Sequence, residues 1–320
     1  MMCPVCLNPA SAPALKGTDF LFETTSKTFT LDSCTACRSL FLNPMPGSAE
    51  IEVFYPAQYW WNQNRPGLLK RAESVYRRMA LRGHLSFVTK AAGKGRSLTL
   101  LDVGCGSGTL LGLLKQRGFR VTGVDLSEEA ARVAQEENGV RVVTGSLLQA
   151  AFSDESFDFV TLFHVMEHVP NPREVLAEAF RILRPRGALI LQVPNIDSWQ
   201  FKVFGARWYG LDIPRHVVDY TGPAILNLLV ECGFSPHRVR HFNLRDNAPA
   251  LVSSLFPSLD PVSRAVRQAK RNTREIAIAA WVRHVIYFLL VVSAYPFSTL
   301  ESAFGCGATI MIEARKKGDS

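Results

Sequence analysis

The hydrophobic and polar positions of the chain follow two periods in turn from residue 97 onward. Short apolar runs at 98–103, 120–125 and 140–144 have the composition of buried strands. Between them, the segments 109–117 and 127–138 carry apolar residues at helical spacing. Strands that alternate with helices predict a parallel sheet covered by helices on both faces, so we expect an α/β domain.

The alternation continues beyond residue 150. The uninterrupted apolar run at 157–165 predicts a strand buried on both faces, and the amphipathic segment 172–185, which begins and ends with proline, predicts a helix. The last strand candidate, 306–316, comes only after a long helical insertion at 248–304. We therefore assign 96–320 to one α/β domain that carries a helical, hydrophobic insertion.

The insertion combines a basic segment with an apolar one. Its uncharged part runs from Val285 to about Leu300, contains Pro296, and is shorter than the ~18–20 residues that a membrane-spanning helix needs. It predicts either a core helix pair that covers a binding pocket, which we favour, or an interfacial hairpin in an anionic bilayer. In the second case 264–300 forms a peripheral membrane contact. The basic residues that precede the apolar part are Arg264, Arg267, Lys270, Arg271 and Arg274.

The first 95 residues lack this regular alternation. Residues 1–45 show the β-prone and turn residues of a small ribbon. Residues 46–95 begin with a connector rich in proline and aromatic residues and continue at 68–95 with helical periodicity. The sequence thus predicts three parts: a ribbon, a connector with a helical segment, and the α/β domain.

Four of the seven cysteines form two C-x-x-C pairs in the ribbon, Cys3 with Cys6 and Cys34 with Cys37. Two thiolates on a tight turn can point at one ion, and two such turns supply the tetrahedral set of a structural Zn²⁺. A ribbon this short buries little core, so a bound metal would supply its folding free energy. A redox role is the alternative, but two copies outside a thioredoxin-like βαβ unit argue against it.

Composition and charge indicate in which compartment the protein works and which classes of partner it can bind. The chain has 320 residues, 47% of them hydrophobic, a net charge of +8, and no basic and apolar leader at its amino terminus. We therefore expect a reducing cytoplasm, in which grouped cysteines bind metal, rather than export by a signal peptide. The positive charge permits a polyanion, a nucleotide-linked substrate, or an anionic surface at the inner face of the membrane, and selects none of them.

The stretch LLDVGCGSG turns from a strand into a helix on three glycines. Gly104, Gly106 and Gly108 allow positive φ and the close approach of a ligand, but their spacing departs from the dinucleotide fingerprint. Asp102 stands two residues before the first glycine, where it would repel a pyrophosphate and attract a cation. The turn therefore favours a cationic ligand over a dinucleotide.

S-adenosylmethionine fits this charge pattern, because it carries an ammonium and a sulfonium and no phosphate. Asp125 ends the next strand about 20 residues on, where a carboxylate can accept hydrogen bonds from both ribose hydroxyls. The alternative is a glycine-rich turn whose two acids only cap or pair locally.

Four segments in order, LLDVGCGSG, VTGVDLS, SFDFVTLFHVMEHVPNP and RILRPRGALILQVPN, resemble the class I S-adenosylmethionine-dependent methyltransferases over roughly 97–195. Within that class the chain is similar to ubiquinone-type O-methyltransferases and to nucleotide-sugar methyltransferases, and the latter also begin with a zinc-binding segment. The resemblance implies a Rossmann-like sheet, mostly parallel, whose last strand is antiparallel. Ser146 stands where many relatives have an acid that holds the adenine, so its side chain or the Leu147 N–H would take that role. The implied cofactor-binding residues are Asp102, Gly104, Cys105, Gly106, Gly108, Asp125, Leu126, Ser146, Leu147 and Phe163.

Two segments are candidates for the methyl-acceptor site. HVMEHVPNP places His168 just after the fourth strand, and WYGLDIPRHVVDYT, 208–221, collects aromatic and charged residues without a period. A hydroxyl acceptor must lose its proton, and a histidine suits that role. We take His216 as the preferred general base, His168 as the second candidate, and Tyr220 as a further catalytic residue. The alternative is that His168 only bonds backbone and that 208–221 is a packed aromatic loop with an Arg–Asp pair.

The predicted activity is methyl transfer to oxygen or carbon of a small-molecule, sugar-linked or lipid-linked acceptor. Ribosomal RNA is the first alternative, because certain RNA guanine methyltransferases also begin with a zinc-binding segment. The residues after the fourth strand lack the [DN]PP[YF] signature of base-amine methylation, and no cysteine lies there for pyrimidine C5 chemistry, which disfavours nucleic acid. A non-catalytic zinc-ribbon adaptor that keeps the cofactor fold is the second alternative.

Overall fold

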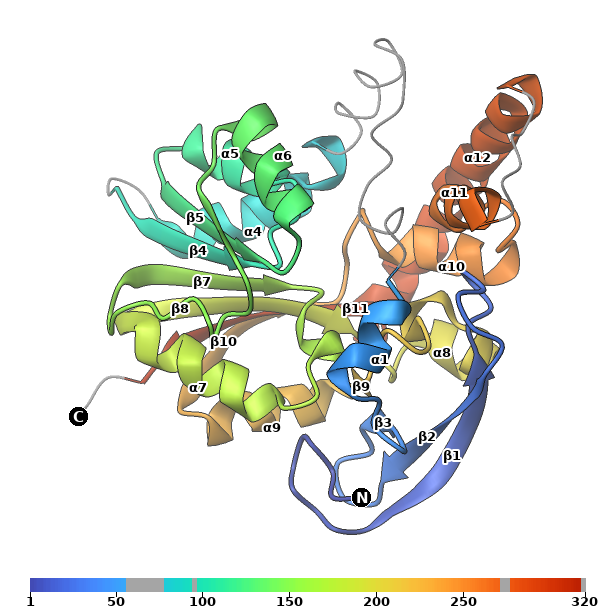
Figure 1. Ribbon diagram of the computed structural model, residues 1–320, viewed down its shortest axis with the longest axis horizontal. Coiled ribbons are helices and arrows are strands. Elements are labelled where there is room, and N and C mark those ends of the chain that lie inside the picture. The colour runs from blue at the N-terminus through green and yellow to red at the C-terminus, as the bar shows by residue number, and fades with distance from the viewer. Residues whose placement is uncertain (56–77, 94–96, 271–276, 318–320) are drawn as a thin grey trace. The chain divides into compact units, whose positions relative to one another are not determined.

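Figure 1 shows the computed structural model, which describes residues 1–55, 78–93, 97–270 and 277–317. The chain divides into two compact units, each assembled from three separate stretches. The first unit comprises 1–64, 194–224 and 240–310, and the second comprises 65–193, 225–239 and 311–320. The first part of the helix predicted at 68–95 lies outside the described residues.

The second unit is built on a seven-stranded sheet whose order is β10–β11–β8–β7–β4–β5–β6. β4 pairs in parallel with β5 on one side and with β7 on the other, and β5–β6 and β7–β8 are also parallel. Because the chain order reverses at β4, ligands are expected beyond the carboxyl end of this strand. The strands are β4 (Thr99–Val103), β5 (Arg120–Asp125), β6 (Val142–Thr144), β7 (Phe157–Phe163), β8 (Leu183–Pro194), β10 (Phe234–Arg240) and β11 (Thr309–Lys316).

The last strand, β11, runs against β8. The N–H of Asn195, just after β8, donates to the carbonyl of Ala308, just before β11, at 2.9 Å. At the other end, Nζ of Lys316 donates to the carbonyl of Leu183 at 2.7 Å. The end of each strand therefore lies beside the start of the other, which confirms the antiparallel last strand.

Helices cover both faces of this sheet, as the alternation of elements predicts (Figure 1). Helix α6 (Glu128–Asn138) shows why the boundaries were predictable: the Ser127 side chain accepts from the Ala130 N–H, and Gly139 ends the helix in the left-handed conformation. Leu110 and Leu111 of α5 pack with β4 in the main core of the unit. The other helices are α4 (Arg82–Ala92), α5 (Thr109–Lys115), α7 (Pro172–Ile182) and α9 (Gly222–Glu231).

The first unit contains the ribbon, completed by a strand from far along the chain. β1 (Ser11–Thr18), β2 (Thr28–Cys34) and β3 (Leu40–Leu42) form an antiparallel sheet, and β9 (Val218–Asp219) pairs with β3 as its fourth strand. Leu40 lies opposite Asp219 and Phe41 opposite Val218. The strand β9 belongs to the loop that the sequence singles out as a candidate acceptor site, so ribbon and loop share one sheet.

The insertion forms α10 (Asn247–Leu255), α11 (Pro261–Lys270) and α12 (Ala277–Ala303), and α12 corrects two expectations. It is one helix of 27 residues that continues through Pro296, so the apolar part is neither a helix pair nor a hairpin. Only 6% of its most apolar window is buried, so it is not a core helix. By length and composition alone, Ile278–Ala303 is long enough to cross a membrane. The sequence estimate was too short because it started after Arg283 and treated Pro296 as an interruption.

A buried guanidinium joins the ribbon to the 208–221 loop within the first unit. Nη2 of Arg215 donates to Oδ1 of Asp19 at 2.7 Å and to Oδ1 of Asp212 at 2.6 Å, and Nη1 donates to the other oxygen of Asp19 at 3.1 Å. The Phe54 carbonyl accepts from the same guanidinium, and the Phe22 ring lies 4.4 Å from its Cζ. A buried charge costs several kcal/mol unless it is paired, and here two carboxylates pair it.

Replacing Asp19 by asparagine should lower the free energy of unfolding by about 3–5 kcal/mol, because Arg215 would keep its charge with half of its compensation. Burial alone would raise the pKa of Asp19, but the hydrogen bond and charge of Arg215 outweigh it and hold this pKa below its usual value. The contribution of ionised Asp19 to the free energy of unfolding is therefore complete above the unfolded-state pKa of about 3.9. It is lost as the pH falls through the lower folded-state pKa. Urea denaturation of both proteins at neutral and acid pH measures this difference.

The control is Asp154→Asn, which removes an exposed partner of Arg181. A surface pair contributes at most about 1 kcal/mol, so this variant should stay close to the wild type. Equal losses in the two variants would show that the Asp19 carboxylate is no more important than a surface charge.

Candidate functional site

The glycine turn between β4 and α5 leaves its backbone open to a ligand. Gly104, Gly106 and Gly108 all have positive φ, at 69°, 51° and 66°. A Cβ added at Gly104 would lie 2.7 Å from Cγ2 of Val165, whereas one added at Gly106 would meet nothing within 4 Å. The turn is therefore tightly packed at its start and open at its middle, where a ligand can approach the main chain.

Asp125, at the end of β5, is held against this turn. Its Oδ2 accepts from the Gly106 N–H at 2.8 Å, and its Oδ1 accepts from the Ser127 N–H at 3.0 Å. Burial raises the pKa of Asp125, and these two N–H donors oppose the rise. Each carboxylate oxygen has a second lone pair, so both can still accept from the hydroxyls of a ligand.

Asp102 is buried inside β4, and its Oδ1 accepts from the Thr161 hydroxyl at 2.6 Å. Thr161 lies on the neighbouring strand β7, so this hydrogen bond fixes the orientation of the carboxylate. Thr161 was missed, although a hydroxyl within the otherwise apolar run FVTLF was a usable signal.

The remaining predicted cofactor residues lie around the same edge of the sheet. The Ser146 N–H donates to Oε1 of Gln149, and the Ser146 hydroxyl accepts from the Gln149 N–H, so its polar groups hold a local turn. Leu147 is buried and Leu126 is exposed. Phe163, at the end of β7, packs edge-on against His84 with ring centroids 4.7 Å apart.

Cys105 occupies the space beside β5. A Cβ at Gly123 would lie 2.5 Å from its Sγ, so the glycine there makes room for the thiol. Burial, followed by the charges of Asp102 and Asp125, raises the pKa of Cys105. The thiol therefore stays protonated at neutral pH and serves packing rather than nucleophilic chemistry.

A polar cluster follows β7; the sequence indicates His164 and Glu167 at this strand end, but the third member, Gln192, was missed. His164 has a φ of 55°, its Nδ1 lies 3.0 Å from Oε1 of Glu167, and its Nε2 lies 2.9 Å from Nε2 of Gln192. Glu167 and Gln192 are completely buried. A glutamine within the apolar run LILQVP was the available signal. His168, the second candidate base, is half-buried in the 3₁₀ turn Met166–His168, which belongs to the same segment.

His216, the preferred base, is 7% exposed and lies just before β9 in the first unit. Its Nδ1 is 2.9 Å from the Gly210 carbonyl oxygen. A carbonyl only accepts hydrogen bonds, so Nδ1 carries the hydrogen and Nε2 is the basic nitrogen of the neutral ring. Oδ1 of Asp219 lies 3.6 Å from Nδ1, and its charge stabilises the ring after it takes up a proton. The third candidate, Tyr220, is completely buried, and its carbonyl accepts from the Ile196 N–H.

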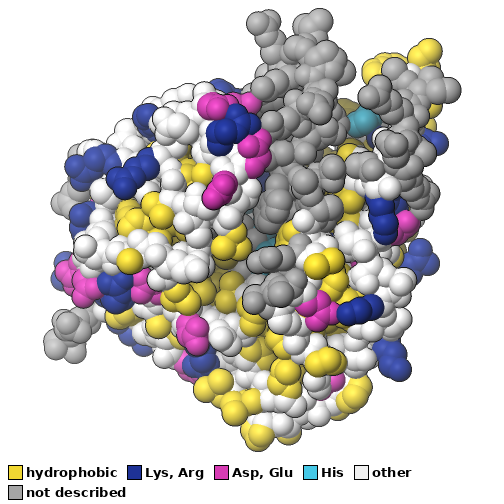
Figure 2. Space-filling model, viewed as in Figure 1, with side chains coloured by type: hydrophobic (Ala, Val, Ile, Leu, Met, Phe, Trp, Pro, Cys, Tyr) yellow, Lys and Arg dark blue, Asp and Glu magenta, His cyan; other side chains and the backbone are white. Residues whose placement is uncertain are grey.

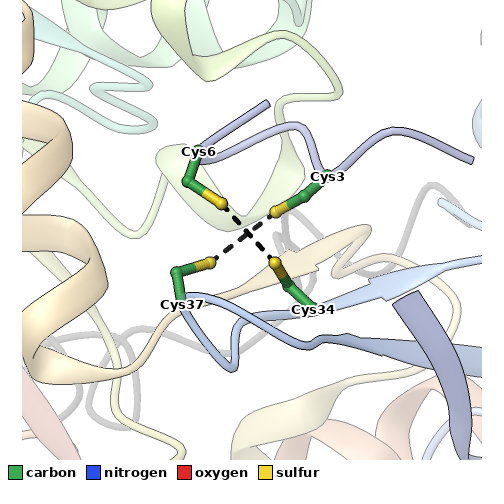
Figure 3. A group of neighbouring side chains, drawn as sticks. All are labelled: Cys3, Cys6, Cys34 and Cys37. Carbon is green, nitrogen blue, oxygen red and sulfur yellow. Dashed lines mark hydrogen bonds between the residues drawn. The ribbon is translucent and has the colours of Figure 1, made fainter. Parts of the chain in front are cut away.

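The four ribbon cysteines converge as the sequence predicts (Figure 3). Sγ of Cys3 lies 3.7 Å from Sγ of Cys37, Sγ of Cys6 lies 3.5 Å from Sγ of Cys34, and all four sulfurs lie within 4.8 Å of one another. A tetrahedral ion with metal–sulfur bonds of ~2.3 Å requires sulfurs about 3.8 Å apart, so the four thiols have the spacing of a metal site. The hydrogen bond from Cys3 lowers the pKa of Cys37 to about 4.

Comparison with known proteins identifies the family. The family model of the methyltransferase domain matches residues 71–239, which include the glycine turn, Asp125 and His216. The chain belongs to the methyltransferase domain family. This membership confirms the predicted class I S-adenosylmethionine-dependent methyltransferase, and the strand order of the methyltransferase sheet agrees with it.

Several curated relatives carry the name ubiquinone biosynthesis O-methyltransferase. The protein of this name from Azoarcus sp. is 32% identical over 188 residues, which are 56% of this chain and 77% of the relative. The protein from Pseudomonas fluorescens is 36% identical over 129 residues, which are 38% of this chain and 56% of the relative. The chain thus spans about half the length of the Pseudomonas relative. A solved SAM-dependent methyltransferase from Archaeoglobus fulgidus is 17% identical, with a TM-score of 0.48 over 76% of this chain and 94% of that one.

Proposed function

We propose that the protein transfers the methyl group of S-adenosylmethionine to a hydroxyl group of a small-molecule, sugar-linked or lipid-linked acceptor. The observation that carries the proposal is the glycine turn with Asp125 hydrogen-bonded to Gly106, within a stretch that matches the methyltransferase domain. The names of the relatives support an oxygen acceptor, and methyl transfer to carbon is the alternative that product analysis distinguishes.

The residues of the turn fit the cofactor in charge and in space. S-adenosylmethionine supplies an electrophilic methyl group on a sulfonium. The open backbone at Gly106 admits the ligand, Asp125 accepts hydrogen bonds from the ribose, and Asp102 places a negative charge near the cationic end. The first N–H groups of α5 face a carboxylate of the ligand, as at other helix amino termini.

We assign His216 as the general base that removes the proton of the acceptor hydroxyl. Its Nδ1 is held by the Gly210 carbonyl, which leaves Nε2 as the nitrogen that accepts a proton, and Asp219 supports the charge that develops. His168 is the second candidate, and Tyr220, which is buried, contributes through the position of the loop. Nucleic acid is disfavoured as the acceptor, because the residues after β7 read HVMEHV and lack the base-amine signature.

The four cysteines are proposed to hold one structural Zn²⁺. Four thiolates leave no open coordination position, so the ion stabilises the ribbon and takes no direct part in the reaction. Thr221 links this site to the acceptor loop, because its hydroxyl donates to the Cys37 carbonyl at 3.1 Å.

Calorimetry with S-adenosylmethionine tests the cofactor site. The wild type should bind with measurable heat, and Asp125→Ala should raise the dissociation constant at least about tenfold, because a hydrogen bond to a charged group contributes about 1.5–3 kcal/mol. Asp154→Asn, at the surface, serves as the control and should bind like the wild type. A wild type that gives no heat at high ligand concentration would refute the proposed function.

Elemental analysis tests the metal site. Purified protein should contain about one zinc per chain, and Cys34→Ser should lose most of it because a three-thiolate set no longer closes the tetrahedron. The matched control is Cys232→Ser, since this half-buried cysteine lies outside the ribbon. A wild type that contains no metal and is as stable with a chelator as without it would contradict the site.

Turnover tests His216. With labelled S-adenosylmethionine and an organic-solvent extract of cells as the acceptor source, His216→Asn should lower the rate by about 10²- to 10⁴-fold while cofactor binding is retained. The rate of the wild type should fall at acid pH, because only the neutral imidazole accepts a proton. The pH–rate profile of the variant should lack this decline. His237→Asn, an exposed histidine on β10, is the control. If instead His168→Asn abolishes turnover and His216→Asn does not, the base is His168.

A further inference from the structure

The last helix of the insertion presents an apolar face that nothing in the described residues covers. Along α12, side chains spaced three and four residues apart are exposed, among them Trp281 at 65% and Leu289 at 60%. We call this set the apolar face of α12. Its large members are Ile278, Trp281, Val282, Val285, Ile286, Phe288, Leu289, Val292, Phe297 and Leu300. In Figure 2, hydrophobic side chains gather at the exposed end of this helix.

The opposite face of α12 is fixed to the protein from His284 to Glu301. Val291 and Ala294 are buried in a cluster with Ala248 and Val252 of α10. The Tyr287 hydroxyl lies 3.1 Å from the Ser253 hydroxyl, and the Tyr295 hydroxyl donates to the Leu244 carbonyl. Near its end, Glu301 is completely buried and accepts from the side chain of Gln200 at 2.9 Å. The helix is therefore held along the surface of the first unit, with one face inward and one outward.

The exposed charges within the described part of the insertion are of one sign. Among the described residues from 247 to 304, the carboxylates are Asp260 and Glu301, and both are buried. The basic residues of the same stretch include Lys270 and Arg283, and both are exposed. An uncharged face of large apolar and aromatic side chains, in a segment whose exposed charges are cationic, has the composition of a helix that lies in the interface of an anionic bilayer.

We propose that the apolar face of α12 docks on an anionic phospholipid bilayer, with the helix lying in the plane of the membrane. The exposed side chains enter the boundary between headgroups and acyl chains, and Lys270 and Arg283 bind the anionic headgroups. Trp281 lies near the same end as these cations and suits the interfacial region, where aromatic rings concentrate. The inference rests on α10, α11 and α12 alone and holds whatever the methyl acceptor is.

The contacts of the inward face exclude a helix that crosses the bilayer in this conformation. A crossing helix would carry Ser253, Glu301 and the backbone of α10 into hydrocarbon, where polar groups are unfavourable. In the plane of the interface these groups stay within the protein, and only the outward face meets lipid.

A second copy of the chain fits the face less well than a membrane does. Each copy carries a net charge of +8, so two copies repel each other, whereas an anionic surface attracts the chain. The attraction between each surface cation and the anionic headgroups adds to the burial of the apolar side chains.

Vesicle flotation of the purified full chain tests the proposal. The protein should float with vesicles of phosphatidylcholine and phosphatidylglycerol in equal amounts, and much less with phosphatidylcholine alone. Leu289→Glu should abolish flotation, and Lys270→Gln and Arg283→Gln should each weaken it about fivefold. The matched control is Val230→Glu on α9, an exposed valine of the second unit, which should float like the wild type. Circular dichroism and cofactor binding confirm that each variant is folded.

Fluorescence gives an independent readout. The emission of the wild type should shift to shorter wavelength when the anionic vesicles are added, and Trp281→Phe should remove most of that shift. Equal flotation of wild type and Leu289→Glu would overturn the proposal. So would a wild type that stays in solution as a dimer in the presence of vesicles, or one that resists extraction from membranes by high salt and alkaline carbonate, which would indicate a crossing helix.

Discussion

The first unit depends on the buried ion pairs that the Arg215 guanidinium forms with two carboxylates. This guanidinium has no exposure to water, so its charge is tolerable only while Asp19 from the ribbon and Asp212 from the loop both remain in place. Loss of either carboxylate leaves an uncompensated charge in the interior. The ribbon and the loop that carries His216 are thereby stabilised as one piece.

The proposed cofactor residues and the preferred base lie in different units. The proposed cofactor residues all lie in the second unit, and the geometry that holds them, such as Asp125 against Gly106 and Asp102 against Thr161, is complete there. The preferred base lies in the first unit, on a loop whose strand β9 belongs to the sheet of the ribbon. The four ribbon cysteines therefore lie in the same unit as the preferred base, and not in the unit that contains the proposed cofactor residues.

Much of the second unit could be predicted from the sequence, because its elements are local and strongly periodic. Ser127 and Gly139 mark the ends of α6, and the glycine turn is encoded by residues that adjoin in the chain. The two C-x-x-C pairs were equally readable, since metal ligands have a fixed spacing. The hydrogen bonds of Asp102 and His164 were missed because their partners, Thr161 and Gln192, lie on other strands.

The errors concern contacts that the sequence does not carry locally. A proline within an apolar segment usually ends a helix, but the packing of Val291 and Ala294 on α10 stabilises α12 on the amino-terminal side of Pro296, and the buried Glu301 does so beyond it. Burial of a helix is likewise a property of its neighbours rather than of its composition. The composition of the apolar run at 285–300 does not distinguish a helix that packs in a protein core from one that faces lipid.

The pairing of Phe41 with Val218 also has a consequence for biosynthesis. The ribosome adds about 5–20 residues per second, so β3 leaves the exit tunnel roughly 10–40 s before the strand that completes its sheet is made. Throughout that interval β3 presents an unpaired edge, a form in which strands recruit partners from other chains. The nascent ribbon passes through this interval of edge exposure in every molecule that is synthesised.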